Sequence, residues 1–429
     1  MKKIVVVGSG FGGLSIASKL KAKKFDVTLI EKHKDLGGRA RTFVHNDFKY
    51  DAGPTVITAP YLIDELFSAH GEKLSDYVNL LPVKPWYRFL FDSGDYIDYG
   101  DKLISTVHEI KAKYGNDKAQ AYLKLLKHSK QIFKKGFIEL SDEPFESIFS
   151  MLKHLPALIK IRFDRSVYQT VNKYLNNKNL NEALSMHPLL VGGNPYSTTS
   201  IYLLIQYLEW KWGVYYAEGG TGRIIDGLEK LLIKKDVNIK KNTEAKKIIL
   251  KNNKVVGIDT SQGIIDCDIV VCNSDPTYTY NNLLGFKPKK ASNRFNLKHS
   301  MSLFVLYFST TKIYKDVKHH TIIFSKRHYE LLNDIFNKKV FVSDPSLYLH
   351  RPGATDPSMI QNGNDTFYVL APVPNNLSKI DWNDKGNELA NIIIKNLQEK
   401  IMPELTKNIS DMFFVTPDYF ENELNTYAG

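Results

Sequence analysis

The stretch "KKIVVVGSGFGGLSIASKLKAKKFDVTLIEKHKDLGGRARTF", residues 2–43, decides the fold. Residues 4–7 form a short, continuous run of β-branched residues, which is typical of a buried parallel strand. Apolar residues at helical spacing then predict a helix; they are Leu14, Ala17 and Leu20. Residues 26–31 have the pattern of the next strand. The segment therefore predicts a βαβ unit, the start of an α/β fold with a Rossmann-like domain.

A glycine loop joins the first strand to the helix. Gly8, Gly10 and Gly13 match G-x-G-x-x-G, and Gly12 lies in the same loop. These glycines allow a tight turn, a close approach of backbone to a pyrophosphate, and close packing of helix on strand. Glu31 ends the second strand, where a carboxylate accepts hydrogen bonds from a ribose 2′-hydroxyl and repels a 2′-phosphate. The loop predicts a dinucleotide other than NADP and by itself leaves NAD and FAD open.

Composition narrows the class of protein. The formal net charge is +12, which indicates either a lysine-rich solvated surface or attraction to an anionic one. The sequence has no long basic block and no nucleic-acid motif, so we expect no nucleic-acid partner and favour anionic lipid. Cys267 and Cys272 are too few for a disulfide framework. With no signal-peptide pattern and no run of about 18 apolar residues, we expect a cytoplasmic protein, peripheral to the inner face of the cell membrane.

The rest of the chain predicts two interleaved domains. Residues 60–210 look mainly helical, and a strand pair with a turn near Gln262 and Gly263 follows in the middle of the chain. Strong strand patterns recur at 269–271, 300–310 and 365–374. With the motifs described next, we expect a discontinuous FAD-binding domain at 1–90 plus 215–290, and a mixed sheet-plus-helix domain for substrate and membrane docking at 91–214 plus 291–429.

Further motifs resemble the amine-oxidase-like FAD flavoproteins. They are "DLGGRARTF" with Gly38 and Arg39, and "YDAGPTVI" with Asp51, Gly53, Pro54 and Thr55. The resemblance implies FAD, with the glycine loop under its diphosphate, and adds Lys32 and Ala245 to the cofactor contacts. In that family a segment like "NTEAKKI" contacts the adenine side through its backbone. The returning strand "CDIVVCNSDP" carries Ser274 where the family commonly has alanine.

Longer stretches resemble one branch, the bacterial phytoene desaturases. They include "LLVGGNPYSTTSIYLLI", "EWKWGVYYAEGGTG", "SLYLHRPGATDPSM" and "FYVLAPVPN". The resemblance implies hydride loss from phytoene to flavin followed by proton loss, toward neurosporene or lycopene. It also implies an electron acceptor such as quinone or oxygen. The rivals are a related carotenoid desaturase, isomerase or saturase, a non-catalytic carotenoid- or flavin-binding protein, and a soluble amine oxidase.

A forty-carbon hydrocarbon substrate requires a membrane source. Each CH₂ group favours an apolar environment by about 0.8 kcal/mol, so such a chain does not cross water freely. Residues 150–163, "SMLKHLPALIKIRF", mix apolar and basic side chains as interfacial helices do. The alternative is an ordinary surface helix interrupted by Pro156.

The sequence leaves the catalytic acid or base open. Arg351 and Asp356 are candidates, since they either line the site or hold a polar turn. Residues 148–150 read Ile-Phe-Ser where related enzymes often carry an acid. His319 and His320 are adjacent, with no partner histidine or acid at ligand spacing in the sequence, so we expect no metal site.

The resembled family continues past "NELNTYAG" with a Gly- and Pro-rich segment that covers the flavin. From this we expect the 429-residue chain to bind FAD weakly and to turn over poorly. Tight, stoichiometric FAD in the purified chain would contradict that expectation.

Overall fold

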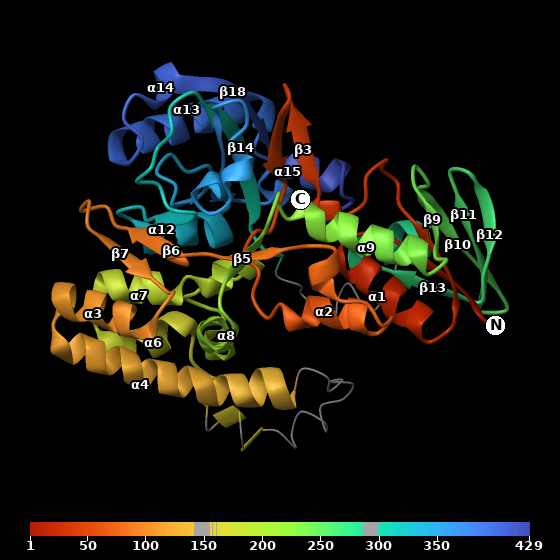
Figure 1. The fold of residues 1–429 in the computed structure, drawn as a ribbon, viewed down its shortest axis with the longest axis horizontal. Coiled ribbons are helices and arrows are strands. Elements are labelled where there is room, and N and C mark those ends of the chain that lie inside the picture. Colours follow the sequence, from red (N-terminus) through yellow and green to blue (C-terminus); the bar gives the residue numbers. More distant parts are fainter. Residues whose placement is uncertain (141–154, 157, 160, 286–298) are drawn as a thin grey trace.

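The computed structural model describes residues 1–140, 155–156, 158–159, 161–285 and 299–429 (Figure 1). Its first sheet is parallel, in the order β13-β1-β2-β9. These strands are β1 (Lys3–Val7), β2 (Asp26–Ile30), β9 (Asn238–Lys240) and β13 (Ile269–Cys272). Helix α1 (Phe11–Ala22) follows β1 directly. The βαβ unit predicted from the sequence is confirmed.

Alternating side chains of the first sheet enter two different cores. Val6 and Leu29 pack with α1 and with α9 (Gly222–Lys234) on one face. Val5 and Ile30 pack on the other face against a meander of antiparallel strands. The meander consists of β10 (Ala245–Lys251), β11 (Lys254–Thr260) and β12 (Gly263–Asp266). Because successive strand residues point to opposite faces, the continuous apolar run of β1, Ile4 followed by three valines, suits a sheet covered on both sides.

The second sheet has the order β18-β14-β17-β16-β15-β6-β7. Neighbours pair antiparallel except β15 with β6, which are parallel. The strands are β6 (Tyr87–Leu90), β7 (Tyr96–Tyr99), β14 (Ser302–Thr310), β15 (His320–Ile323), β16 (Leu347–His350), β17 (Asp365–Val373) and β18 (Ile409–Val415). Helix α13 (Trp382–Lys400) covers one face through Leu389 and Leu397. The hairpin of β3 (Thr42–His45) and β4 (Phe48–Asp51) packs on the other.

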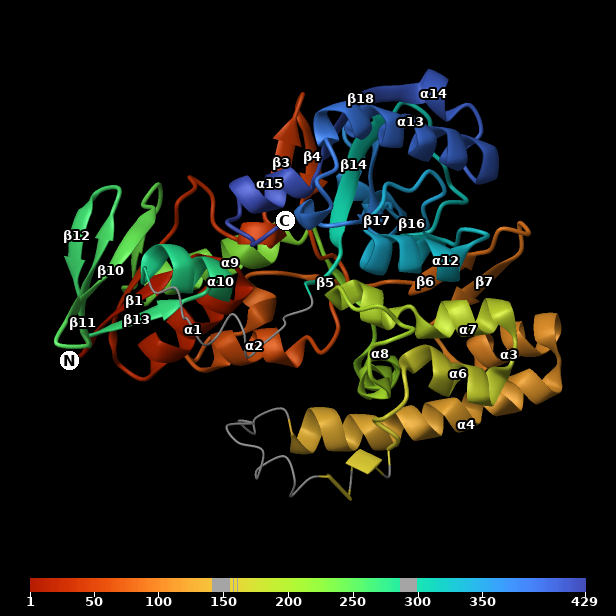
Figure 2. The ribbon, with the colours of Figure 1, turned by 180° about the vertical axis from the view of Figure 1, so that it is seen from behind.

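Helices form a layer beneath the second sheet (Figures 1 and 2). They are α3 (Leu103–Tyr114), α4 (Asn116–Phe133), α6 (Val167–Leu175), α7 (Lys178–Ser185) and α8 (Leu204–Trp212). The short α2 (Tyr61–Ser68) lies by the first sheet instead. Shorter helices complete the fold: α10 (Pro276–Tyr278), α12 (His328–Asn333), α14 (Leu405–Asn408) and α15 (Pro417–Asn422). No helix in the described ranges is long and apolar enough to span a bilayer.

Residues 60–210 are mainly helical, as expected, but they also contain the short strands β5 (Leu80–Pro82), β6 and β7, and β5 pairs with β8 (Tyr215–Ala217). The signal for a hairpin was present in the turn 92–95, Asp-Ser-Gly-Asp, but the flanking strands are too short to stand out. Strand β6 joins the second sheet although it lies within the range 1–90 expected for the cofactor domain, and the domain boundaries stay a prediction.

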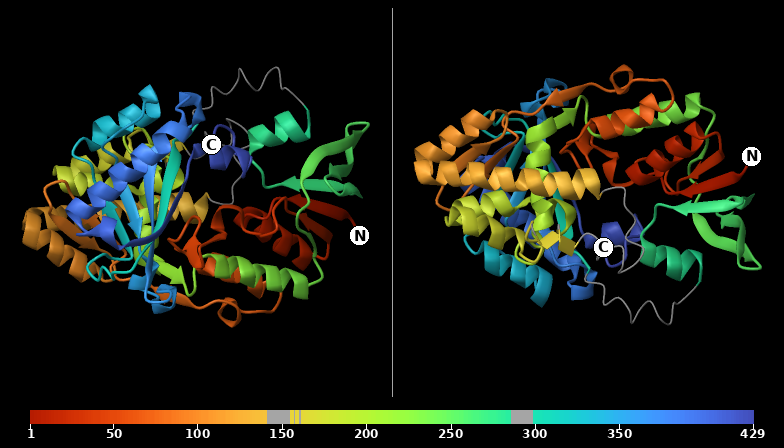
Figure 3. Two further views of the ribbon diagram at one scale, coloured as in Figure 1. Left: turned by 90° about the horizontal axis from the view of Figure 1, so that it is seen from above. Right: turned by 90° about the horizontal axis from the view of Figure 1, so that it is seen from below.

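The chain end lies between the two sheets. Figure 3 shows the last residues, including α15, in the space between the first sheet and the second sheet. Asn376 N–H donates to the carbonyl of Ala428 at 2.9 Å, which fixes the end against the turn after β17.

Gly13→Ala should destabilise the protein more than Gly12→Ala. A Cβ at Gly13 would lie 1.9 Å from the carbonyl oxygen of Gly8, which is backbone and has no room to move. A Cβ at Gly12 would meet Asn273 Oδ1 at 2.3 Å, the end of a side chain that can rotate. We expect Gly13→Ala to lower the free energy of unfolding by about 1–3 kcal/mol. Urea unfolding of both variants measures it, and equal losses would contradict the packing argument.

Candidate cofactor and substrate site

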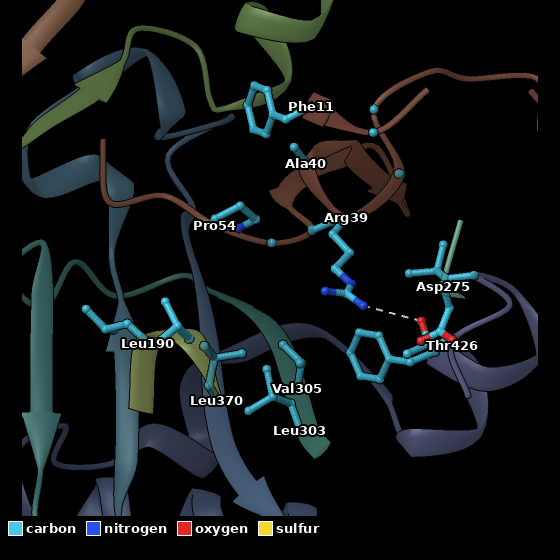
Figure 4. A pocket seen from close by; sticks show the side chains of 18 of the residues that line it. Phe11, Arg39, Ala40, Pro54, Leu190, Asp275, Leu303, Val305, Leu370 and Thr426 are labelled. Atoms are coloured by element: carbon cyan, nitrogen blue, oxygen red, sulfur yellow. Dashed lines mark hydrogen bonds between the residues drawn. The ribbon is translucent and has the colours of Figure 1, made fainter. Parts of the chain in front are cut away.

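A cavity of about 1020 Å³ begins at the glycine loop and extends to the second sheet. One end is lined by predicted cofactor residues: Gly8, Gly10, Glu31, Lys32, Gly38, Arg39 and Ala245. The other end is apolar, with Leu189, Leu190, Ile205, Leu303, Val305 and Leu370. Figure 4 shows Leu190, Leu303, Val305 and Leu370 gathered at that end, and Arg39 beside Asp275 and Thr426 at the other. Pro54, with Gly53 and Thr55, lies between the two ends.

The glycine loop forms a cradle for a ligand. Gly8 has a φ of +87° and Gly37 a φ of +109°, conformations that side chains disfavour. Gly10 and Gly37 pair through an isolated bridge, which brings the two glycine-rich turns together under the cavity. Gly12 and Gly13 lie behind the loop, against Asn273 and Gly8. They therefore shape the cradle and do not line it.

Glu31 sits at the cavity edge as the sequence predicts. Its side chain is largely buried, and Oε2 accepts hydrogen bonds from Ser9 N at 3.0 Å and Ser9 Oγ at 2.6 Å. Oε1 accepts from His33 N at 3.0 Å. A carboxylate offers about four lone-pair sites, so these contacts orient it and still leave capacity for a ligand hydroxyl. The contact with a ribose stays a prediction.

The C-terminal turn contacts the basic side chains of Arg39 and Lys32 at the glycine-loop end of the cavity. Arg39 donates to Thr426 Oγ1 at 3.3 Å, and Lys32 Nζ donates to the carbonyl of Asn422 and to Asn425 Oδ1, both at 3.2 Å. Residues 423–426 also line the cavity. The sequence did not predict this contact, because it joins segments almost 400 residues apart.

Asp51 anchors the segment that runs past the middle of the cavity. It is buried, and its Oδ2 accepts from Tyr216 Oη at 2.7 Å while Oδ1 accepts from Thr221 N at 2.7 Å. A Cβ on Gly53 would lie 2.0 Å from the carbonyl oxygen of Arg39, so only glycine lets these two strands of backbone approach. The predicted "DAGPT" residues are thus held rigidly along the wall.

The structure brings a third histidine to His319 and His320, which have no partner at ligand spacing in the sequence, and the expectation of no metal site stays a prediction. His320 pairs with His350 across β15 and β16, and nitrogens of His319, His320 and His350 lie within 4.8 Å of one another. Register between strands, which the sequence does not reveal, brings them together. Burial lowers the pKa of all three rings, well below the ordinary value for His319 and His320. The rings are therefore neutral at pH 7.

Arg351 and Asp356 lie away from the cavity. The Arg351 guanidinium is buried and donates to Asp365 Oδ2 at 2.6 Å and to the carbonyl of Val317 at 3.0 Å. Asp356 accepts from Gly219 N at 2.6 Å and from Ser358 Oγ at 2.7 Å. These contacts favour the structural alternative, a polar turn, over a role in proton transfer.

Several cavity residues were not predicted. Asn273 and Asp275 follow β13 where its carboxyl end meets the loop, a position at which parallel sheets bind ligands. Glu209 is a buried carboxylate in the wall, bonded by Tyr87 Oη at 2.9 Å and paired with His187 at 3.1 Å. Tyr348 and Tyr368 come from the second sheet. Residues 148–150 and half of the proposed docking stretch 150–163 lie outside the described residues.

The residues at the cradle fit FAD. Backbone without side chains faces the cavity at Gly8, Gly10 and Gly38, which suits a diphosphate. Arg39 and Lys32 supply positive charge, and Glu31 supplies acceptors for a ribose. The volume lies at the upper end of the roughly 300–1,000 Å³ common for ligand pockets, enough for a dinucleotide and a further ligand segment.

Comparison with known proteins agrees with this arrangement. The family model for flavin-containing amine oxidoreductases matches residues 11–336. A lycopene-forming phytoene desaturase of Pseudescherichia vulneris is 39% identical, over 100% of this chain and 88% of its own length. A neurosporene-forming phytoene desaturase of Rhodobacter capsulatus is 34% identical, over 100% of this chain and 84% of its own. A solved oxidoreductase of Methanosarcina mazei shares the fold, with a TM-score of 0.66 and 15% identity over 96% of this chain and 87% of its own.

The chain belongs to the flavin-containing amine oxidoreductases. Within that family it belongs to the bacterial phytoene desaturases, whose members match it from end to end. The family and the fold predicted from the sequence are confirmed, with FAD as the cofactor and an oxidoreductase as the class of enzyme.

Acid should destabilise the fold through its buried histidines. Burial lowers the pKa of His328 to about 4, and also lowers the pKa of His319, His320 and His350. The unfolded chain protonates its histidines near pH 6.5, so below that pH it binds more protons than the folded chain. The free energy of unfolding should fall from pH 6.5 toward 4, by up to about 1.4 kcal/mol per pH unit for each histidine.

Urea unfolding between pH 7.5 and 4.5 measures this slope. His328→Gln should reduce the slope, while His108→Gln, at an exposed position, should leave it unchanged. Equal slopes in the two variants would show that the buried histidines do not carry the effect.

Proposed function

We propose that this chain desaturates phytoene, or a closely related polyene, in carotenoid biosynthesis. The observation that carries the proposal is the continuity of the cavity: the wall that starts at Gly10 and Arg39 runs on to Val305 and Leu370. A cofactor in the cradle and an apolar chain at the other end would meet beside Pro54 and Thr55. The curated names of the relatives, lycopene-forming and neurosporene-forming phytoene desaturases, support the same substrate and products.

The bound FAD supplies the acceptor for a hydride. The chain's own residues have the remaining tasks: they hold the polyene straight, exclude water and receive a proton. Leucine, valine and isoleucine side chains from the helical region and from the second sheet line the apolar end. Excluding water keeps an electron-deficient allylic carbon from being hydrated before it loses its proton.

An anaerobic spectrum tests the proposal. We expect phytoene in liposomes to bleach the oxidised flavin band of the FAD-loaded protein, and a longer polyene spectrum to grow as the band falls. A quinone or oxygen should then restore the oxidised band. Bound flavin that stays oxidised with phytoene, while an amine bleaches it, would contradict the proposal.

We also propose that the protein takes its substrate from a membrane surface. Support comes from Leu190 and Val191 in the turn after α7: both line the cavity, yet 42% and 58% of their surfaces are exposed. Exposed apolar side chains at the opening of an apolar cavity suit contact with lipid. The net charge of +12 adds attraction to anionic headgroups.

The double variant Leu190→Glu, Val191→Glu should weaken association with anionic liposomes by roughly ten-fold or more, since two apolar side chains lose their lipid contact. Liposome flotation measures the bound fraction. Ile264→Glu is the matched control, because Ile264 is 66% exposed on β12 and lies away from the cavity. Equal flotation of the double variant and wild type would contradict docking through this opening.

A further inference from the structure

A group of hydroxyls forms the wall where the two ends of the cavity meet. Thr55 Oγ1 lies 2.7 Å from Tyr368 Oη and 3.2 Å from Tyr348 Oη. All these residues line the cavity. Thr55 comes from the segment after β4, Tyr348 from β16 and Tyr368 from β17. The three residues therefore form part of the wall that a polyene would pass on its way to the cofactor.

The two tyrosines differ in what lies behind them. Tyr368 O–H donates to the carbonyl oxygen of Gly53 at 3.2 Å. An amide carbonyl is too weak a base to take a proton. Tyr348 Oη lies 2.6 Å from His320 Nδ1. With the proton of that imidazole on Nε2, Tyr348 donates to Nδ1 and keeps a lone pair directed to other partners. Of the two phenols, Tyr348 is connected to a base.

His320 is suited to receive a proton. It is fully buried, and burial, followed by the neighbouring His350, lowers its pKa well below the ordinary value, so Nδ1 carries a free lone pair at pH 7. Nε2 has no hydrogen-bond partner among the described residues. The titratable side chains around the ring come from every strand packed against it: Tyr87 of β6, Tyr348 and His350 of β16, and the preceding His319.

We propose that Tyr348 and His320 together form the proton acceptor of the desaturation step. The proposal rests on the function proposed above. After a hydride leaves one carbon of the polyene, the adjacent C–H bond breaks and its electron pair becomes the new C=C bond. The proton passes to Tyr348 Oη as the phenol proton passes to His320 Nδ1. One hydride and one proton leave the polyene, so the electrons and atoms balance.

A weakly basic imidazole suffices for this step. A C–H bond next to an allylic cation is a very strong acid, so proton transfer to a neutral nitrogen is downhill. The phenol acts as a relay because burial raises the pKa of Tyr348 and keeps it protonated before the reaction. Asp51 Oδ2 lies 3.5 Å from His350 Nε2, so a carboxylate charge is present one ring away from the new imidazolium. This charge favours the proton on the histidine side of the wall.

Tyr348→Phe and Tyr368→Phe are the matched pair for a test. Each removes one hydroxyl bonded to Thr55 from the same wall, but only Tyr348→Phe cuts the connection to a base. A positioned general base contributes about 10²–10⁴-fold, so we expect Tyr348→Phe to lower kcat with phytoene by about 100-fold or more. Tyr368→Phe should lose less than about ten-fold. KM should change little in either variant.

His320→Asn tests the histidine, the second residue of the proposed proton acceptor. Its amide retains an acceptor near the position of Nδ1 for the Tyr348 hydrogen bond, but it does not take up a proton. We expect the same loss of kcat as in Tyr348→Phe. Binding of a coloured polyene to the FAD-loaded variants, followed by the shift of its absorbance, should stay close to wild type, since the aliphatic lining of the cavity is unchanged.

Several results would overturn the relay. Equal losses of kcat in Tyr348→Phe and Tyr368→Phe would contradict the relay, and so would a wild-type kcat in His320→Asn. In either case, turnover of phytoene by the wild-type protein would leave the proposed function standing. One equivalent of a first-row divalent metal in purified protein, lost in His350→Asn, would assign the histidines to metal binding instead. Wild-type protein that neither bleaches with phytoene nor releases a longer polyene would overturn the proposed function and the relay with it.

Discussion

The buried carboxylate of Asp51 holds the two sheets in their relative positions. It ends β4, which follows directly from the cofactor loops, and it is bonded by Tyr216 of β8 and by Thr221 at the start of α9. His350 of the second sheet lies 3.5 Å from the same oxygen that Tyr216 contacts. A buried charge is costly without such partners, so these segments are constrained to meet at one point.

This junction sets the shape of the cavity. The residues directly after Asp51 run along its middle, with the cradle of glycines on one side and the aliphatic side chains of β14 and β17 on the other. Because Gly53 packs against the backbone of Arg39, the segment has little freedom to move into the cavity. A flavin ring system and a hydrocarbon chain require different surroundings, polar and apolar, within a few ångströms. The junction provides both without a layer of protein between them.

The parts of the site that the sequence predicted are the local ones. The strand, the glycines, the helix and Glu31 are contiguous in the chain, and each has a steric or electrostatic reason to occur there, so residues 2–43 sufficed to predict a dinucleotide cradle; FAD and Ala245 came from the family resemblance. The histidine and tyrosine groups depend on register between strands: His320 and His350 come from β15 and β16, and Tyr368 from β17. The contact of Arg39 with Thr426 spans nearly the whole chain. No pattern of apolar residues encodes such pairings, and the adjacent His319 and His320 looked isolated for that reason.

The sequence did not predict strands β6 and β7 for a related reason. They are short, and their stability comes from joining β15 at the edge of the second sheet and from packing of aromatic rings such as Tyr87, Phe89 and Tyr99. Tertiary contacts rather than local propensity determine such strands. The resemblance to phytoene desaturases, by contrast, depended on long stretches that nucleotide binding does not require, and the comparisons confirmed it.

Cofactor and polyene should share the cavity and meet at the wall of Thr55 and Tyr348. A crystal structure of the FAD-loaded protein with a bound polyene is the decisive experiment. We expect flavin density over the glycine loops and an extended hydrocarbon between Leu190, Val305 and Leu370, with one carbon in contact with the Tyr348 hydroxyl. A polyene bound outside the cavity, or separated from the flavin by the chain at Pro54 and Thr55, would contradict it.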